Sequence, residues 1–266
     1  IDGGGIPLLE IPYLKSKKLL NFESQFRNNY IGFNVKKFPF NNKEVRKAFS
    51  LAIDKSIFEK VLYNPVIKTE SWIPPGLIGS IHSNKPRYNK EIANELLNQN
   101  GFEDRGKFPK VMFLFPESGN NRIIAEILQT MWMENLGVQV EIRGLEWKIY
   151  LITLDIDRPH MFRAGWAADY PDPHNFMNIF SCNGGNNETG WCNSNYDEKI
   201  NKASYETSEE KRREMYINAQ EELIYNQNTI IPLFISNQIY LKNKRIKKVS
   251  FSKMGIIDFS KVETNP

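Results

Sequence analysis

An alternation of strand and helix patterns between residues 109 and 165 constrains the fold more than any other feature of the sequence. Short apolar or alternating runs predict buried strands at 109–115, 138–142 and 160–165. Helical periodicity fills the intervals at 121–136 and 145–154. Gly137 follows the first of these helices, where a left-handed stop is expected. Strands separated by helices and short connections are typical of an α/β layer with a mixed, largely parallel sheet.

The flanking segments carry further helix and strand patterns. The apolar run at 30–35 predicts a strand, and residues 1–12 predict a loop that enters an extended segment. Asn41 or Asn42 can cap a helix that continues to Ile53. Thr207 and Glu210 form a capping box for a helix that ends near residue 225. Further helices are expected at 56–62, 88–100 and 196–205, a strand at 229–235, and short β-like runs at 239–266.

Size and charge exclude several classes of protein. With 266 residues and 41% hydrophobic positions, the chain can bury a core without metal or disulfide support. The net charge of +4 is small, and the basic runs at 15–18 and 242–248 lack interleaved aromatic residues, so we expect no nucleic-acid partner. No apolar run reaches the length of a membrane span. Ile1 in place of Met indicates a processing boundary or a truncation, and a secretion signal upstream would not be visible.

The two cysteines, Cys182 and Cys192, lie ten positions apart in a segment rich in Asn and Gly. A disulfide-closed loop is the natural interpretation, and it would stabilise the fold by about 2.5 to 3 kcal/mol in the loop-entropy model. A disulfide indicates an oxidising compartment outside the cytosol. Free thiols in a cytosolic protein are the alternative. Zinc is disfavoured because no two further ligands lie nearby at a useful spacing.

Residues 163–176 are the most unusual segment, and they follow the last predicted parallel strand. Ligands of α/β sheets gather beyond the carboxyl ends of the strands. Gly165 permits a close turn, Trp166 offers a flat apolar surface, and Asp169 supplies a carboxylate for an ammonium group. Arg163 could bind the carboxylate at the other end of a zwitterion. In the alternative, Trp166 fills the core, Asp169 caps a turn and Arg163 forms a surface salt bridge.

Catalysis and metal binding find no support in this segment. Asp169, Asp172 and His174 could be drawn as a metal site or as an acid and base pair. Pro171 and Pro173 impose extended geometry, however, so a turn with a solvated Asp172 and His174 is favoured. No nucleophile elbow, zinc-protease motif or phosphate-binding glycine loop occurs. We therefore expect no enzyme, no cofactor and no metal.

Several segments, in order along the chain, resemble the family-5 extracellular solute-binding proteins of ATP-driven importers, which include oligopeptide-, dipeptide- and nickel-binding members. These segments are Tyr30-Ile-Gly-Phe-Asn-Val, residues 39–55, the loop at 72–76, residues 88–102, Gly165-Trp-Ala-Ala-Asp-Tyr-Pro-Asp-Pro, Asn195-Tyr-Asp and the final capped helix. The order and spacing of these segments are more specific than any one motif.

The resemblance implies a lobe of the periplasmic-binding-protein type (type II), in a periplasmic or lipid-anchored cell-surface protein that captures short peptides for a membrane permease. Asp169 matches the acidic residue that pairs with the α-amino group of the peptide, and Trp166 matches the aromatic residue beside it. Arg163 resembles the oligopeptide-binding version, whereas the cysteine pair resembles the dipeptide-binding branch. The expected ligand-binding residues are Asp169, Trp166, Arg163 and Tyr170.

Members of that family run to roughly twice this length, and the chain matches their carboxyl-terminal half. We therefore expect residues 1–35 and 232–266 to be strands of a first lobe with partly exposed apolar faces, and 36–231 to form one complete lobe. The full-length protein is expected to be a monomer. Alternatives are a nickel, heme or other solute ligand, the sensor domain of a transcription regulator, and an enzyme with Asp169 and Asp172 as paired carboxylates.

Overall fold

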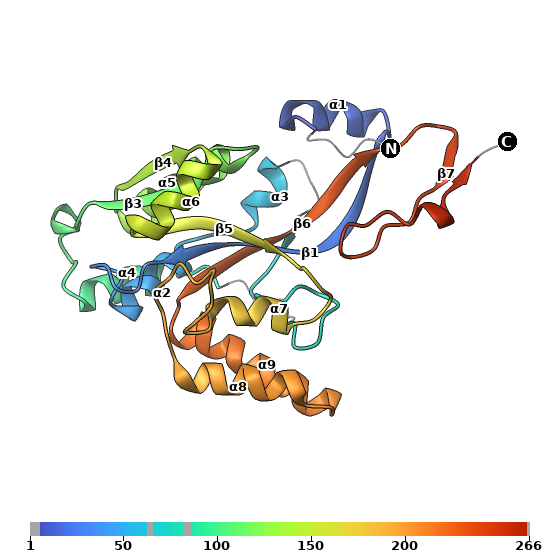
Figure 1. Cartoon of the computed structure of the whole chain (residues 1–266). Helices are drawn as coiled ribbons and strands as arrows, with labels where there is room; N and C mark the ends of the chain where they lie inside the picture. The colour runs from blue at the N-terminus through green and yellow to red at the C-terminus, as the bar shows by residue number, and fades with distance from the viewer. Residues whose placement is uncertain (1–5, 63–65, 82–86, 265–266) are drawn as a thin grey trace.

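Six strands form one mixed sheet in the computed structural model, which describes residues 6–62, 66–81 and 87–264 (Figure 1). The strands stand in the order β2-β6-β1-β5-β3-β4, so the first and last long strands of the chain lie side by side. Their bounds are β1 Leu20–Phe33, β2 Ile67–Lys68, β3 Val111–Pro116, β4 Val140–Leu145, β5 Met161–Ala167 and β6 Ile230–Leu241.

The sheet is parallel only in one half. β3 pairs in parallel with β4 and with β5, as the strand and helix alternation predicts. β1 pairs antiparallel with β5 and β6, and β2 pairs antiparallel with β6. A mixed sheet flanked by helices is therefore confirmed, but its parallel part is smaller than expected. The long-range pairing of β1 is the reason, because no local pattern encodes a partner more than a hundred residues away.

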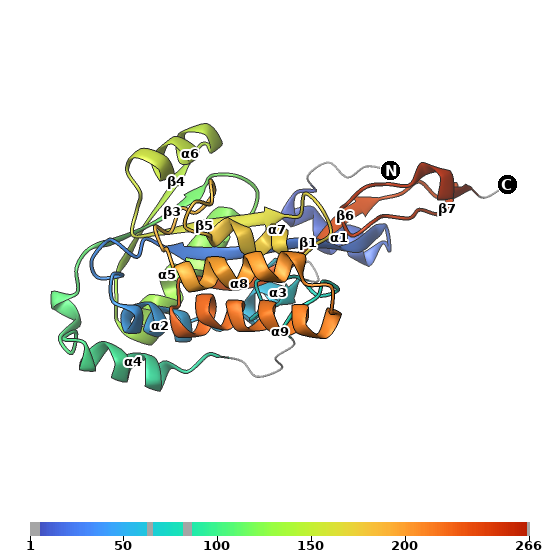
Figure 2. The ribbon, with the colours of Figure 1, turned by 60° about the horizontal axis from the view of Figure 1, so that its bottom comes forward.

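Alternation along the strands divides the interior into two cores. Ile31 of β1 and Phe113 of β3 face the first core, whereas Tyr30 and Leu114, their neighbours in sequence, face the second. Helices α2 to α5 contribute to the first core and α6 to α9 to the second. Figure 2 shows α8 and α9 side by side below the strands. The bounds are α2 Lys43–Leu51, α3 Ile57–Val61, α4 Lys90–Gln99, α5 Asn121–Leu136, α6 Trp147–Ile156, α7 His174–Met177, α8 Ser194–Tyr205 and α9 Glu209–Gln220.

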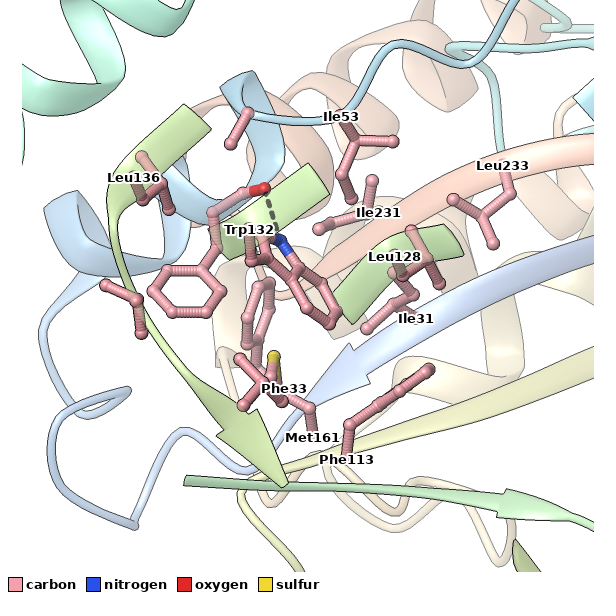
Figure 3. Packing of buried hydrophobic residues seen from close by; sticks show 14 of the residues in the cluster. Ile31, Phe33, Ile53, Phe113, Leu128, Trp132, Leu136, Met161, Ile231 and Leu233 are labelled. Carbon is pink, nitrogen blue, oxygen red and sulfur yellow. Dashed lines mark hydrogen bonds between the residues drawn. The ribbon is translucent and has the colours of Figure 1, made fainter. Parts of the chain in front are cut away.

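The first core is built around an aromatic cluster. Trp132 of α5 is fully buried, and Figure 3 shows its indole beside Leu128 and Ile231 with Phe113 below. The indole N–H donates to the carbonyl oxygen of Phe49 at 3.2 Å, so its polar atom is satisfied inside the core.

Local capping signals place several helix ends where the sequence predicts them. The Asn42 side chain accepts from the backbone N–H of Glu44 at the start of α2, and Gly137 ends α5 with a φ of 68°. The predicted capping box is wrong, because Ser208 rather than Thr207 caps α9. Residues 8–16 form η1 (Leu8–Glu10) and α1 (Ile11–Ser16) instead of a loop. Three further 3-10 helices are η2 Arg105–Lys107, η3 Asn178–Phe180 and η5 Phe259–Lys261, and the π-helix η4 Glu221–Asn226 continues α9.

Beyond the sheet, β1 and β6 continue together as a two-stranded extension. Leu20 pairs with Leu241, and the Gln25 amide donates to Gln238 at 2.6 Å. α1 and the hairpin of β7 (Ile246–Lys248) and β8 (Glu263–Thr264) lie at this end, near both termini (Figure 1). We call α1, the outer halves of β1 and β6, and residues 242–264 the arm. Residues 1–5 and 265–266 of the two expected first-lobe segments lie outside the described residues.

Helices of the described chain are too short and too polar to cross a bilayer.

Candidate functional site

A cleft of about 920 Å³ opens at the carboxyl ends of β3 and β5. Its walls come from the middle of β1, the end of β5, the outer part of β6, the start of α5, one side of α6 and the loop between the two cysteines. This is the edge of the sheet at which the strand pattern predicts a ligand site. A second, more open hollow of about 600 Å³ lies between α4 and the end of α5 and contains none of the predicted residues.

Arg163 lies on β5 with its guanidinium against the cleft, and only 8% of the residue is exposed. Its Nη2 donates to Asn29 Oδ1 at 3.0 Å, and its Nε has no hydrogen-bond partner. Burial lowers the pKa of Arg163 to about 10, the Tyr150 phenol opposes this shift, and the nearby Arg27 adds to it. The guanidinium is therefore still charged at neutral pH. A cation in the lining of the cleft is suited to binding a carboxylate of a ligand.

Asn175 joins Trp166 to Asp169. Its Oδ1 accepts from the Trp166 indole at 2.8 Å and from the Asp169 backbone N–H at 3.0 Å. Its Nδ2 donates to Asp169 Oδ2 at 3.2 Å. Asn175 itself is buried in α7, so these contacts fix the indole and the carboxylate relative to each other. The sequence analysis missed this residue, although an amide directly after the Asp-Pro-His turn was the available signal.

The four predicted ligand residues divide into two pairs. Arg163 and Trp166 line the cleft, whereas Asp169 and Tyr170 do not belong to its lining and are exposed to solvent. Across the described ranges no lysine or arginine forms an ion pair with Asp169, so its carboxylate is not neutralised within the chain. The role of Asp169 in binding an ammonium group stays a prediction.

The Asp172 carboxylate is held by hydrogen bonds within the protein and is not simply solvated. It accepts two hydrogen bonds from Arg212 Nη2, at 2.7 and 2.9 Å, and it caps the backbone N–H of His174 at 2.8 Å. The expectation of a solvated Asp172 is wrong because α9, far along the sequence, brings Arg212 to this turn. The part of the chain that the structure describes contains no group of His, Cys, Asp or Glu residues able to hold a metal ion.

The predicted disulfide between Cys182 and Cys192 is confirmed. The carboxylate of Asp197 in α8 accepts from the Cys182 backbone N–H at 3.1 and 3.2 Å, which anchors one end of the loop. Asn186 and Glu188 of this loop line the cleft. The disulfide therefore closes a loop that forms one wall of the candidate site.

The residues of α6 that line the cleft were not predicted from the sequence either. Trp147, Tyr150, Leu151 and Leu154 line the cleft from this helix. Trp147 is 56% exposed and stacks on Tyr150 with ring centroids 5.8 Å apart. The available signal was that α6 is apolar on almost every side, which is unusual for a surface helix and indicates a contact surface.

The mixed sheet, its two helical layers and the cleft form a fold of the kind found in periplasmic binding proteins. The match to solved structures supports this class. A periplasmic oligopeptide-binding protein (OppAIV) from Borrelia burgdorferi superimposes with a TM-score of 0.84 at 29% identity, over 91% of this chain and 49% of that chain. Haemophilus influenzae OppA in complex with the peptide RPPGFSPFR gives a TM-score of 0.81 at 27% identity, over 91% of this chain and 49% of that one.

Residues 1–188 match the model of the bacterial extracellular solute-binding proteins, family 5 Middle. The chain belongs to this family. The oligopeptide-binding protein OppA of Bacillus subtilis (strain 168) is 29% identical over 266 residues, which cover 96% of this chain and 48% of OppA. The chain thus spans about half the length of the relatives that it matches.

Proposed function

We propose that the chain is the ligand-binding lobe of the substrate-binding component of an ABC peptide importer, which captures dipeptides or oligopeptides and delivers them to a membrane permease. The observation that carries this proposal is the cleft, in which the buried guanidinium of Arg163 lies on the same wall as the Trp166 indole. A charged donor for a carboxylate and a flat apolar surface suit a peptide terminus and its side chains. Relatives named for oligopeptide binding support the same ligand class.

The proposal includes a capture step without chemical conversion of the peptide. It places the protein in the periplasm or, with a lipid anchor, on the cell surface, and it makes the full-length protein a monomer. Residues 36–231 are the binding lobe in this proposal, and residues 1–35 and 232–266 contribute to the first lobe. The middle of β1 pairs with β5 inside the sheet of the binding lobe, so β1 would serve both lobes.

Calorimetry with a short peptide and its amino-terminally acetylated analogue tests the proposal. The experiment uses the polypeptide that contains this sequence at its natural length. Loss of one charge-assisted hydrogen bond corresponds to about 1.5 to 3 kcal/mol, so acetylation is expected to weaken binding by about 10- to 100-fold. Asp169→Asn is expected to remove that difference, and Glu141→Gln on the exposed side of β4 is the matched control.

Equal affinity for both peptides would remove Asp169 from its assigned role. Absence of binding to any peptide, together with tight binding of a nickel chelate or heme, would overturn the peptide assignment itself.

A further inference from the structure

The cleft has an uneven distribution of charge. Among its described lining residues only Arg27, Arg163 and Glu188 carry a formal charge. Arg27 and Arg163 belong to the sheet wall, in β1 and β5, whereas Glu188 belongs to the loop between the cysteines. A ligand in the cleft therefore meets two cations on one wall and a single carboxylate on another. The position of this carboxylate is independent of Asp169, which lies outside the lining.

The loop holds Glu188 in a fixed place. Asn187 donates to the carbonyl oxygens of Ser181 and Trp191, and its own Oδ1 accepts from Thr189 Oγ1 at 2.6 Å. The carbonyl oxygen of Thr189, which is fully buried, accepts from the Val35 backbone N–H at 2.9 Å. Both sequence neighbours of Glu188 are thus locked, and the disulfide closes the loop around them. A carboxylate on such a support loses little further entropy when it binds a ligand.

Arg158 forms an ion pair with one oxygen of the Glu188 carboxylate and leaves the other oxygen able to accept hydrogen bonds from a ligand. Arg158 Nη2 lies 2.9 Å from Oε2, and the two side chains are 29% and 25% exposed. A carboxylate offers about four lone-pair positions, so one ion pair does not saturate it. Arg158 does not line the cleft, whereas Glu188 does. Burial raises the pKa of the Tyr30 phenol in the cleft, and the negative charge of Glu188 raises it further, so the field of this carboxylate reaches the lining.

Two indoles in the lining can add to the binding of a positively charged ligand. Trp147 and Trp166 line the same cleft as Glu188. Indole faces attract ammonium and guanidinium groups, and a carboxylate accepts charge-assisted hydrogen bonds from them. A neutral or acidic ligand group gains neither interaction.

We propose that Glu188 is a specificity-determining residue of the cleft and selects ligands that place a positively charged group against the disulfide loop. The inference rests on the proposed function and adds a preference to it. A lysine or arginine side chain and a free amino terminus share this chemistry. The experiment therefore separates the two sources of charge.

Calorimetry uses Ala-Lys-Ala, the uncharged analogue with norleucine in place of lysine, and both peptides in acetylated form, with the natural-length polypeptide. Wild-type protein is expected to prefer lysine over norleucine about tenfold, which is about 1.4 kcal/mol. Glu188→Gln is expected to reduce that ratio to about one and to leave the norleucine peptide within about twofold. If the loss of affinity follows acetylation and not the lysine, the cation that Glu188 binds is the amino terminus, which also supports the proposal.

Two variants besides Glu188→Gln serve as controls, namely Glu141→Gln and Arg158→Met. Glu188→Gln keeps an acceptor for Arg158, so it is expected to fold, and Glu141→Gln is the matched control outside the cleft. Arg158→Met frees the carboxylate and is expected to increase the preference for lysine several-fold, so it gives a second reading in the opposite direction. The inference would be overturned if Glu188→Gln and Arg158→Met changed neither the lysine to norleucine ratio nor the effect of acetylation. An equal loss of affinity for every peptide would also overturn it. Failure of the wild-type protein to bind any peptide would overturn the proposed function instead.

Discussion

The lobe and the arm of this molecule are stabilised in different ways. In the lobe, two clusters of buried side chains lie on the two faces of the sheet, and large residues such as Trp132 and Phe113 are fully buried. In the arm, Phe259 is 73% and Tyr13 is 58% exposed, although the rings of Tyr240 and Phe251 pack at a tilt with centroids 4.5 Å apart. Burial of apolar surface is the main stabilising contribution to folding. Apolar burial therefore contributes more to the stability of the lobe than to that of the arm, which depends on backbone pairing and leaves large apolar side chains exposed.

Removal of an indole from the first core is expected to give the largest effect on the lobe. Trp132→Ala leaves a cavity and an unpaired carbonyl oxygen on Phe49, and large-to-small changes of this kind cost about 3 to 5 kcal/mol. Urea unfolding followed by far-UV circular dichroism measures the free energy of unfolding. A loss below about 1 kcal/mol would show that the core tolerates the cavity and would weaken the contrast with the arm.

Opening the disulfide is expected to have the next largest effect. Replacing both Cys182 and Cys192 with alanine releases the loop in the unfolded chain, which corresponds to about 2.5 to 3 kcal/mol in the entropy model. Hydrogen exchange is expected to accelerate in the loop and in α8, whose Asp197 holds the loop, while amides of the arm keep their rates. Equal acceleration in the arm would mean that the two regions unfold as one unit.

The buried pair of Lys55 and Glu70 gives the stability of the lobe a dependence on pH. Nζ lies 2.6 Å from Glu70 Oε2, and burial lowers the pKa of Lys55 to about 8 although Glu70 opposes the shift. Above pH 8, Lys55 is more often protonated in the unfolded chain than in the folded protein. The contribution of Lys55 to the free energy of unfolding therefore rises with pH, by about 1 kcal/mol from pH 8 to 9. Urea titrations of wild type and Lys55→Met measure the difference between them. A difference that falls with pH would contradict the sign.

Truncation of an exposed aromatic side chain in the arm is expected to have the smallest effect. Phe259→Ala removes a side chain that is mostly in solvent, so the free energy of unfolding should change by less than about 0.5 kcal/mol. The matched comparison is Trp132→Ala, measured in the same buffer. A cost above about 1.5 kcal/mol would show that the arm has a core of its own.

Local signals in the sequence predict much of the lobe, because they act within a few residues. Gly137 marks the end of α5 and Asn42 the start of α2 without reference to the rest of the chain. The antiparallel pairing of β1 with β5 and the Arg212 contact to Asp172 could not be predicted this way, since each joins segments that are distant in sequence.

The candidate site shows the same limit. Arg163 and Trp166 were found because they lie in one unusual segment beside the end of β5, and the structure places both in the cleft. Glu188 and Trp147 enter the site from a loop and a helix whose sequences carry no sign of a shared location. Asn175 joins the predicted residues through its amide, and its role depends on the turn that Asp172 and Arg212 hold.

The walls of the cleft come from residues far apart in the sequence, from Ile6 to Ile239 in β6. During synthesis β1 leaves the ribosome long before β6, its neighbour in the sheet, so the nascent polypeptide holds most of the second core before it has a finished binding surface. A product released before residue 230 would be without β6 and therefore without one side of the cleft. A complete cleft therefore requires that translation has passed β6.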